Sequence, residues 1–376
     1  MKRGKTSLPR LQAYVADWDI PKTIAWDKLD HILYAFAVPD QSGKLGKFNE
    51  KKLQTVVQQA HTNGKDISLS IGGWTGSVFF SSLISTPDNR DKFSTILVNA
   101  VRQYDLDGLN LDWEYPNANN GVSCNQKDPN DTENLLQFVI LLRKKLNQAF
   151  PKENKWITMA VAAKVFNGPD QRPLKQLSPH WAQVVDAFYI MAYDLRGQWD
   201  KFTGANSPMV GQGITVTNAM EAWHAAGIPR QQLVLGVPFY GYTVRTHAKA
   251  KYSTSMNYPL HPSRLQIQGD QYDSAEMEPC ANAKPTYSGE YQWRSIVQDG
   301  ILNNKAGWHS IWDRTSKTPY SINLRQKKFL TFDDPASLRI KADFVNKNDL
   351  GGIMLWSLEM DDDKNSLLNA IQSVRY

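Results

Sequence analysis

The sequence lacks features that define several classes of protein. Only two of its 376 residues are cysteine, Cys124 and Cys280, which is too few for a disulfide framework or a cysteine-rich zinc site. These two residues could pair with each other or both remain free. No apolar run approaches the roughly 20 residues that a transmembrane helix requires, so no membrane association is expected.

Concentrated positive charge is also absent, although the formal net charge is +6. No run of Lys and Arg reaches five residues, so a surface for nucleic acid is not indicated. The seven His residues are scattered without a ligand pattern, and neither a metal ion nor an organic cofactor is expected. The opening residues, 1–5, contain no apolar segment of the kind that a signal peptide carries.

Aromatic residues, by contrast, are abundant. The chain has 12 Trp, 15 Tyr and 14 Phe, and twelve Trp is more than a core of this size usually needs. An indole ring suits a flat, amphipathic ligand such as a sugar, because the ring stacks against its C–H face while polar side chains bind its hydroxyls.

Short apolar runs alternate with amphipathic helical patterns along the chain. Eight strands are predicted: Leu11–Ala16, His31–Val38, Ile67–Ile71, Gly108–Glu114, Trp156–Ala162, Ala187–Tyr193, Leu233–Phe239 and Gly352–Leu358. Helices are expected around 53–60, 93–104, 132–146 and 219–226, the third with Asp131 or Thr132 as its cap. The pattern predicts a closed α/β (β/α)₈ TIM barrel. A doubly wound open sheet is the competing topology, but no Gly-rich dinucleotide motif follows an early strand.

More than a hundred residues separate the last two predicted strands. This interval is rich in Tyr, Ser and Trp and has no dominant helical period, so it is predicted to contain a small α+β domain rather than a linker. The expected organisation is a barrel built from residues 1–242 and 329–376, with an insertion at 243–328 that forms a wall of the substrate groove.

One acidic stretch, from Asp107 to Glu114, carries the strongest functional signal. At the two-residue period of a strand, Asn110, Asp112 and Glu114 share one face, whereas Leu109, Leu111 and Trp113 share the other. Neighbouring carboxylates repel each other, and burial raises the pKa of at least one of them. Such an arrangement is typical of a site that moves protons.

The active site of a barrel lies at the carboxyl ends of its strands. The residues predicted to stand there are aromatic, acidic or Gly-rich: Tyr14, Trp18, Phe36, the Ser70–Trp74 segment, Asn110, Asp112, Glu114, Met191–Asp194, Phe239–Tyr242 and Trp356. Acids surrounded by aromatic rings indicate a carbohydrate-binding cleft.

These motifs together resemble the chitinase-type members of glycoside hydrolase family 18. The resemblance rests on five segments in the family's order: Ser70-x-Gly-Gly, Asp107–Glu114, Met191-Ala-Tyr-Asp194, Gly236–Gly241 and Gly351–Trp356. The segment Phe332–Ser337 also matches, and the similarity covers nearly the whole chain. The resemblance implies retaining, substrate-assisted hydrolysis of β-1,4-linked N-acetylglucosamine polymers.

The resemblance also implies roles for individual residues. Glu114 would donate a proton to the glycosidic oxygen, Asp112 would orient the substrate acetamide, and Tyr193 would hydrogen-bond its carbonyl. Trp356 would form the floor under the distorted sugar, and Trp74 would stack on the leaving-group side. The other predicted site residues are Asp107 and Asn110 in the catalytic motif, and Tyr14, Phe36, Trp113, Met191, Asp194 and Tyr242 in substrate binding.

Two positions depart from the family pattern. Asn110 stands where the motif has the middle of three aspartates, and Tyr242 stands where many relatives have Arg. We expect the Asn110 amide to donate to Asp112 and to hold it ionised and facing away from Glu114. A charge-assisted hydrogen bond contributes about 1.5–3 kcal/mol, so turnover would slow by about one to two orders of magnitude.

Two hypotheses follow from this substitution. In the first, the protein binds chitin or chito-oligosaccharides and its hydrolysis is weakened or lost; in the second, it is an active endochitinase that tolerates Asn110. A third hypothesis is an endo-β-N-acetylglucosaminidase that acts on glycoproteins. The long insertion disfavours it, because such relatives tend to lack an inserted domain. A secreted monomer is expected, and the sequon at Asn130 is compatible with secretion.

Overall fold

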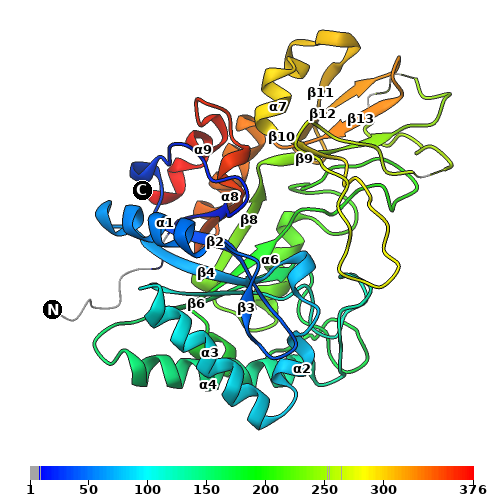
Figure 1. Ribbon diagram of the computed structural model, residues 1–376. Helices are drawn as coiled ribbons and strands as arrows, with labels where there is room; N and C mark the ends of the chain where they lie inside the picture. Colours follow the sequence, from blue (N-terminus) through cyan, green and yellow to red (C-terminus); the bar gives the residue numbers. More distant parts are fainter. Residues whose placement is uncertain (1–7, 9, 252, 254, 264) are drawn as a thin grey trace.

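The computed structural model describes residues 8, 10–251, 253, 255–263 and 265–376. Its larger sheet is a closed parallel barrel, which confirms the predicted (β/α)₈ fold (Figure 1). The strand order is β1-β14-β8-β7-β6-β5-β4-β2, and pairing of β1 with β2 closes the ring. The barrel strands are β1 (Leu11–Ala16), β2 (His31–Pro39), β4 (Asp66–Gly72), β5 (Gly108–Asp112), β6 (Trp156–Ala162), β7 (Ala187–Met191), β8 (Leu233–Pro238) and β14 (Gly352–Trp356).

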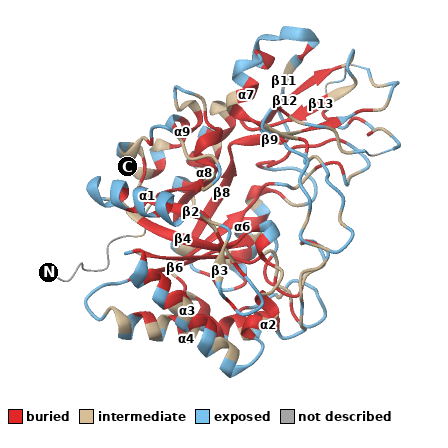
Figure 2. Ribbon diagram, viewed as in Figure 1, coloured by how far each residue is buried: buried red, intermediate tan, exposed pale blue. Residues whose placement is uncertain are grey.

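Helices cover the outside of this barrel. These helices are α1 (Glu50–Thr62), α2 (Phe80–Ile84), α3 (Pro87–Gln103), α4 (Asp131–Ala149), α5 (His180–Val184), α6 (Val216–Ala225), α8 (Pro335–Lys347) and α9 (Ser366–Ala370). Helix α7 (Trp293–Gln298) lies instead in the segment inserted between β8 and β14. Figure 2 shows buried residues along the strands and exposed residues on the outer faces of α1, α3 and α4. The apolar faces of these helices therefore pack inward against the barrel.

Short 3₁₀ helices lie in the connections. They are η1 (Trp26–Lys28), η2 (Trp74–Gly76), η3 (Arg230–Gln232), η4 (Ile301–Asn303), η5 (Lys305–Gly307), η6 (Leu358–Met360) and η7 (Gln372–Arg375). Strand β3 (Leu45–Gly46) pairs antiparallel with the end of β2 and makes a small hairpin there.

Local sequence explains where the helices begin and end. Helix α1 begins after Asn49, whose side chain accepts the backbone N–H of Lys52, and it buries Leu53 and its neighbours on one face. The expected cap of α4 is wrong. Asn130 is the cap residue and makes no side-chain cap bond, whereas Asp131 accepts hydrogen bonds from Ser81 and two backbone N–H groups.

A second, antiparallel sheet lies between β8 and β14 in sequence. Its strand order is β10-β9-β13-β12-β11, and its strands are β9 (Tyr240–Arg245), β10 (Glu290–Gln292), β11 (His309–Asp313), β12 (Thr318–Asn323) and β13 (Lys328–Thr331). A separate apolar cluster that includes Tyr258, Tyr320 and Phe329 packs with this sheet. The sheet extends slightly beyond the predicted 243–328 interval, because its outer bounds are Tyr240 and Thr331.

Cys124 and Cys280 form a disulfide across 156 residues of chain. Cys124 lies in the connection between β5 and α4, and Cys280 lies in the insertion. The bridge therefore joins the barrel to the inserted domain and decides between the two cysteine states that the sequence left open.

Candidate active site

Polar side chains form one layer inside the barrel at the level of Asn110. Ser70 of β4, Asn110 of β5 and Thr158 of β6 are neighbours in register, and all three are buried. The Asn110 Nδ2 group donates to Ser70 Oγ at 2.8 Å, and Thr158 Oγ1 donates to Asn110 Oδ1 at 3.0 Å. The Asn110 amide is thus fixed from both sides.

A hydroxyl group separates Asn110 from Asp112. Asn110 Nδ2 donates to the Tyr14 hydroxyl at 2.8 Å, and that hydroxyl donates to Asp112 Oδ2 at 2.9 Å. The expected direct bond from Asn110 to Asp112 is therefore wrong. Because the second Asn110 N–H is used by Ser70, the amide acts on Asp112 only through Tyr14.

Asp112 lies beside Glu114 and does not face away from it, which corrects the second part of that expectation. Burial raises the pKa of Asp112 to about 7, and hydrogen bonds with Tyr14 and Glu114 act in the opposite direction. Burial also raises the pKa of Glu114 well above its usual range, and the charges of Asp112 and Asp194 raise it further. The two carboxyl groups can therefore share one proton near neutral pH. Asp112 Oδ1 is buried and accepts no hydrogen bond of regular geometry.

The backbone of Glu114 is held from two sides. Its N–H donates to Ser77 Oγ at 2.9 Å, and its carbonyl oxygen accepts from Asn125 Nδ2 at 2.7 Å. Gly72 allows the preceding strand to come this close, because a Cβ there would lie 2.3 Å from the Asp112 carbonyl oxygen. These contacts position the acid before any ligand binds.

The end of β7 supplies further side chains of the site, two strands along the barrel from β5. Met191 and Tyr193 are buried there, and Asp194 adopts a positive φ of 56°. Burial raises the pKa of Asp194, and hydrogen bonds from Tyr240 and Tyr242 lower it. Burial likewise raises the pKa of Tyr193, as do the charges of Asp112, Asp194 and Glu114, so its phenol stays a neutral hydrogen-bond donor.

An aromatic cluster forms the floor of the site. Trp356 is stacked on Phe36 with ring centroids 5.4 Å apart, and it meets the edge of Tyr14 at 5.0 Å. Trp18 and Trp74 are 63% and 42% exposed, so their ring faces remain available to a ligand. Trp199, also largely exposed, lies near Tyr242. Together these rings surround the carboxylates with surfaces suited to sugars.

Two predicted site residues lie elsewhere. Asp107 precedes β5 at the amino end of the barrel, about 16 Å along the strand from Asp112 at roughly 3.3 Å per residue. It bonds His61 Nε2 and the Ile67 N–H, so its role there is structural. Trp113 is buried and stacked on Phe80 at 5.4 Å, and its ring belongs to the core between strand and helix.

The sequence reasoning missed several residues of the site. Thr158 and Ser77 hold Asn110 and Glu114, and Glu290 of β10 lies opposite Tyr242 in the second sheet. Thr158 could have been found, because it is a polar residue inside an otherwise apolar strand. Ser77 lies just after η2 and Glu290 lies in the inserted sheet, and no sequence pattern marks either residue as part of the site.

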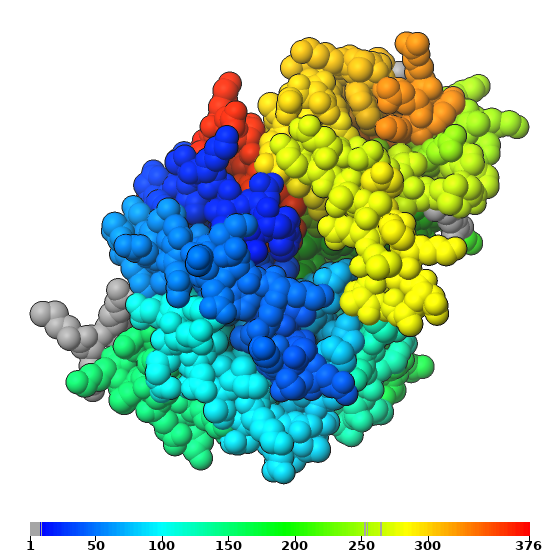
Figure 3. Space-filling model, viewed as in Figure 1, coloured from blue at the N-terminus to red at the C-terminus, as the bar shows by residue number. Residues whose placement is uncertain are grey.

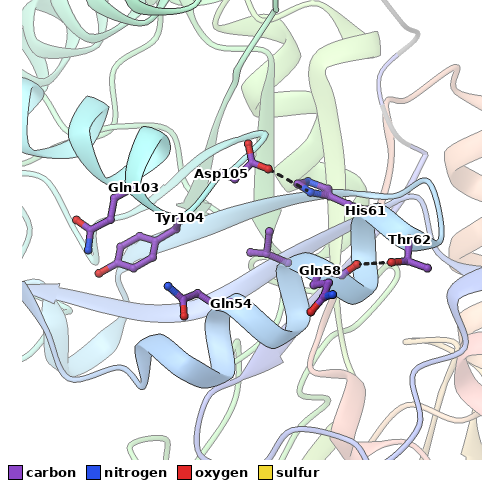
Figure 4. Close-up of a pocket in the computed structure, with 8 residues that line it drawn as sticks. Gln54, Gln58, His61, Thr62, Gln103, Tyr104 and Asp105 are labelled. Atoms are coloured by element: carbon purple, nitrogen blue, oxygen red, sulfur yellow. Dashed lines mark hydrogen bonds and ion pairs between the residues drawn. The ribbon is translucent and has the colours of Figure 1, made fainter.

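A cavity of about 380 Å³ lies at the other end of the barrel, between α1 and the end of α3 (Figure 4). Its lining includes Gln54, Gln58, Gln103 and Tyr104, and His61 Nδ1 lies 3.7 Å from Asp105 Oδ2. This cavity holds no pair of buried carboxylates. The chemistry expected of the chain therefore lies at the carboxyl end of the strands.

Within the part of the chain that the structure describes, no group of three or more His, Cys, Asp or Glu side chains is arranged to hold a metal ion. None of the helices in those same residues is long and apolar enough to cross a bilayer. Residues 1–5, considered above for a signal peptide, lie outside the described residues.

The buried carboxyls predict how stability depends on pH. Burial raises the pKa of Asp112 and Glu359 to about 7 and that of Glu290 to about 8. Unfolded carboxyls titrate near pH 4, roughly, so the folded chain binds more protons between about pH 4 and 8. The free energy of unfolding therefore falls as pH rises through this window.

We expect a melting temperature a few degrees higher at about pH 5 than at about pH 8, measured by scanning calorimetry. Glu359→Gln is the matched control, because it removes one titrating group and should reduce the difference. A melting temperature that rises toward pH 8 would contradict the assignment of these raised pKa values.

Comparison with known proteins agrees with this geometry. The family model described as glycosyl hydrolases family 18 matches residues 10–361. A chitinase-like effector from Moniliophthora roreri is 33% identical, and the alignment covers 93% of this chain and 89% of that protein. Chitinase A1 from Niallia circulans is 29% identical over 92% of this chain and 46% of its own length.

Solved structures show the same relationship. A chitinase from Rhizomucor miehei superposes with a TM-score of 0.94 and 52% identity, covering 98% of this chain and 100% of that one. A mutant of the Ostrinia furnacalis Group II chitinase catalytic domain 2, solved in complex with (NAG)5, has a TM-score of 0.78 and 26% identity; the match covers 97% of this chain and 96% of that one.

Proposed function

Since the chain belongs to glycosyl hydrolase family 18, we propose that it binds chitin or chito-oligosaccharides at this site and that Asn110 slows their hydrolysis. The observation that carries the proposal is the chain of hydrogen bonds from Asn110 through Tyr14 to Asp112, next to an intact Glu114. The relatives named above include both chitinases and a chitinase-like effector. A chitin-binding protein with slow hydrolysis is compatible with similarity to both.

Glu114 would act as the general acid on the glycosidic oxygen. Burial raises the pKa of Glu114 well above its usual range, which favours the protonated form that a proton donor requires. In substrate-assisted hydrolysis the acetamide oxygen of the sugar attacks the anomeric carbon as the leaving group takes the proton. Water then opens the oxazolinium intermediate, and Glu114 recovers its proton, with retention of configuration.

Asp112 and Tyr193 would hold the reacting acetamide. Asp112 Oδ1 is a buried acceptor without a regular partner, which suits the acetamide N–H. The Tyr193 phenol is a neutral donor in the same site, which suits the acetamide carbonyl. Trp356 would lie under the sugar that is being cleaved, because it is a partly exposed ring that packs against both Phe36 and Tyr14 in the aromatic floor.

Asn110 would slow turnover through the direction of the Tyr14 hydroxyl. The amide uses the lone pair of that oxygen, so the Tyr14 proton must point toward Asp112 Oδ2. The bond restrains Asp112 Oδ2, so any shift of the carboxylate toward the acetamide during the reaction would have to break it. The bond to a charged acceptor contributes about 1.5–3 kcal/mol.

The second candidate function is that of a fully active endochitinase that tolerates Asn110. The specific observation in its favour is that Asp112 already lies beside Glu114, so that no large rotation is needed to pair the two carboxyls. The 52% identity to the Rhizomucor miehei chitinase over the whole chain also favours it.

Asn110→Asp distinguishes these two candidates. An aspartate can accept the Tyr14 proton and release Asp112, so we expect kcat on a fluorogenic chito-oligosaccharide to rise by about 10- to 100-fold. Oligosaccharide affinity, measured by calorimetry, should change little, because the aromatic surfaces are untouched.

Thr158→Val is the matched control for that variant. It removes the hydroxyl that donates to Asn110 but leaves the bond from Asn110 to Tyr14. Its kcat should stay at the native level. If the native chain turns over rapidly and Asn110→Asp brings no gain in kcat, slow hydrolysis is refuted and full chitinase activity is favoured. If the native chain does not bind oligosaccharides, both candidate functions are refuted.

We also propose that the protein works outside the cell as a monomer. The Cys124–Cys280 disulfide supports this location, because such bonds form and persist in oxidising compartments. Light scattering after gel filtration would test the assembly, and a mass near 43 kDa is expected for a chain of 42.6 kDa.

A further inference from the structure

The connection between β9 and β10 contains a long hairpin that leaves the second sheet. We call residues 274–287 the strap. Its base is closed by Asp273, whose carboxylate accepts the N–H groups of Gly269, Ser288 and Gly289 at 2.8–3.1 Å. Within the strap, Glu276 and Thr286 exchange two backbone hydrogen bonds. The strap is therefore a defined projection with a fixed base.

The tip of the strap reaches the barrel. Cys280 is bonded to Cys124, and the Cys124 N–H lies 3.2 Å from the Cys280 sulfur. Figure 3 shows the yellow part of the insertion extending down to the cyan and blue surface of the barrel. The tip contributes Pro279 to a cavity of about 310 Å³, whose other walls are the β2–β3 hairpin and the segment from Thr75 to Phe79.

This cavity lies at the carboxyl end of the barrel, on the same side as the candidate site. Its walls follow β2 and β4, and Thr75 comes directly after the exposed Trp74. The cavity therefore adjoins the Trp74 surface on which a sugar would stack. Its volume is at the lower end of the range for ligand pockets, about 300–1,000 Å³.

The Cys124 end of the disulfide lies in the loop that holds the Glu114 backbone. Asn125, the neighbour of Cys124, donates to the Glu114 carbonyl oxygen at 2.7 Å. Gln126 donates its N–H to the Val78 carbonyl at 2.9 Å, beside the Ser77 that holds the Glu114 N–H. The disulfide thus joins the strap to the loop that positions the acid.

We propose that the Cys124–Cys280 bridge fixes the strap as a wall of a further sugar subsite beyond Trp74, so that affinity for long chito-oligosaccharides depends on the bridge. The subsite takes an N-acetylglucosamine unit of the chain that lies over Trp74, and this inference rests on the proposed function. Opening the bridge removes the covalent link at the tip and leaves the base at Asp273, so a ligand would have to order the strap on binding.

The test is a series of affinities measured by calorimetry in the Glu114→Gln background, which prevents hydrolysis. Chitotriose and chitohexaose are titrated into the complete chain with and without Cys124→Ser and Cys280→Ser together. We expect chitohexaose affinity to fall roughly tenfold and chitotriose affinity to stay within about twofold. Loss of stability alone would not produce this dependence on length.

Two further measurements cover the case in which the double serine variant does not fold. Dithiothreitol added to the cysteine-containing chain should reproduce the selective loss. Pro279→Trp keeps the bridge but fills the cavity, and it should also weaken chitohexaose binding selectively.

Equal chitohexaose affinities in the bridged, reduced and Pro279→Trp proteins would overturn the strap proposal while leaving chitin binding intact. Absence of binding by either oligosaccharide to the bridged chain would instead refute the proposed function and the strap proposal together.

Discussion

Replacing Glu114 by glutamine is expected to lower kcat on chito-oligosaccharides by about 10²–10⁴-fold, the usual contribution of a positioned general acid. The amide has nearly the same shape, so the hydrogen bonds to the Glu114 backbone from Ser77 and Asn125 are kept. Only the transferable proton is lost. Oligosaccharide affinity should remain within a few-fold, because stacking on Trp74 and Trp356 does not involve this carboxyl.

Asp107→Asn is the matched control for this experiment. It makes the same chemical change at the other end of the same strand, where the carboxylate bonds His61 and the Ile67 N–H. Some stability should be lost, but kcat for the folded protein should not change. If both variants lose turnover equally, the assignment of Asp107 to a structural role is wrong; if Glu114→Gln keeps native turnover, Glu114 is not the acid.

Replacing Lys341 by methionine is expected to destabilise the protein by about 3–5 kcal/mol. Lys341 of α8 is buried and lies 2.7 Å from Asp333 Oδ1 and 2.7 Å from Ser207 Oγ. Burial lowers the pKa of Lys341, and the charge of Asp333 raises it. Removing the ammonium group leaves the Asp333 carboxylate buried without its cation, which is the costly outcome for a buried ion pair.

Denaturant unfolding followed by Trp fluorescence would measure this loss. The matched control is the double variant Lys341→Met with Asp333→Asn, which removes both charges and should recover part of the stability. A single variant as stable as the native chain would show that the ion pair is dispensable. Because Ser207 Oγ also donates to the Ala192 carbonyl, next to Tyr193, the single variant should weaken oligosaccharide affinity as well.

The barrel could be predicted because its signals are local. Each strand is a short apolar run, and each has the bounds expected to within a few residues, as for Leu11–Ala16 and Trp156–Ala162, which match fully. The strand alternation also placed Asn110, Asp112 and Glu114 on one face. These features depend only on residues near each other in sequence.

The errors concern relations between distant residues. Nothing in the sequence around Asn110 shows that Tyr14, 96 residues away, comes between it and Asp112. The two-residue period of the strand places Trp113 on the face away from Asp112 and Glu114. This period therefore already indicated that Trp113 does not bind the substrate. Asp107 was assigned to the site because it belongs to the same motif as Asp112. The extended strand between the two residues keeps their side chains far apart.

The order of the strands has a consequence for biosynthesis. The barrel closes where β1, the first strand, pairs with β14, which begins only at Gly352. Until the ribosome has released this last strand, β1 and β8 each present an unpaired edge, and such edges invite association between nascent chains. The same late strand carries Trp356. A chain that has not yet reached β14 therefore holds Glu114 without the Trp356 ring, so the candidate site is complete only after this strand has been added.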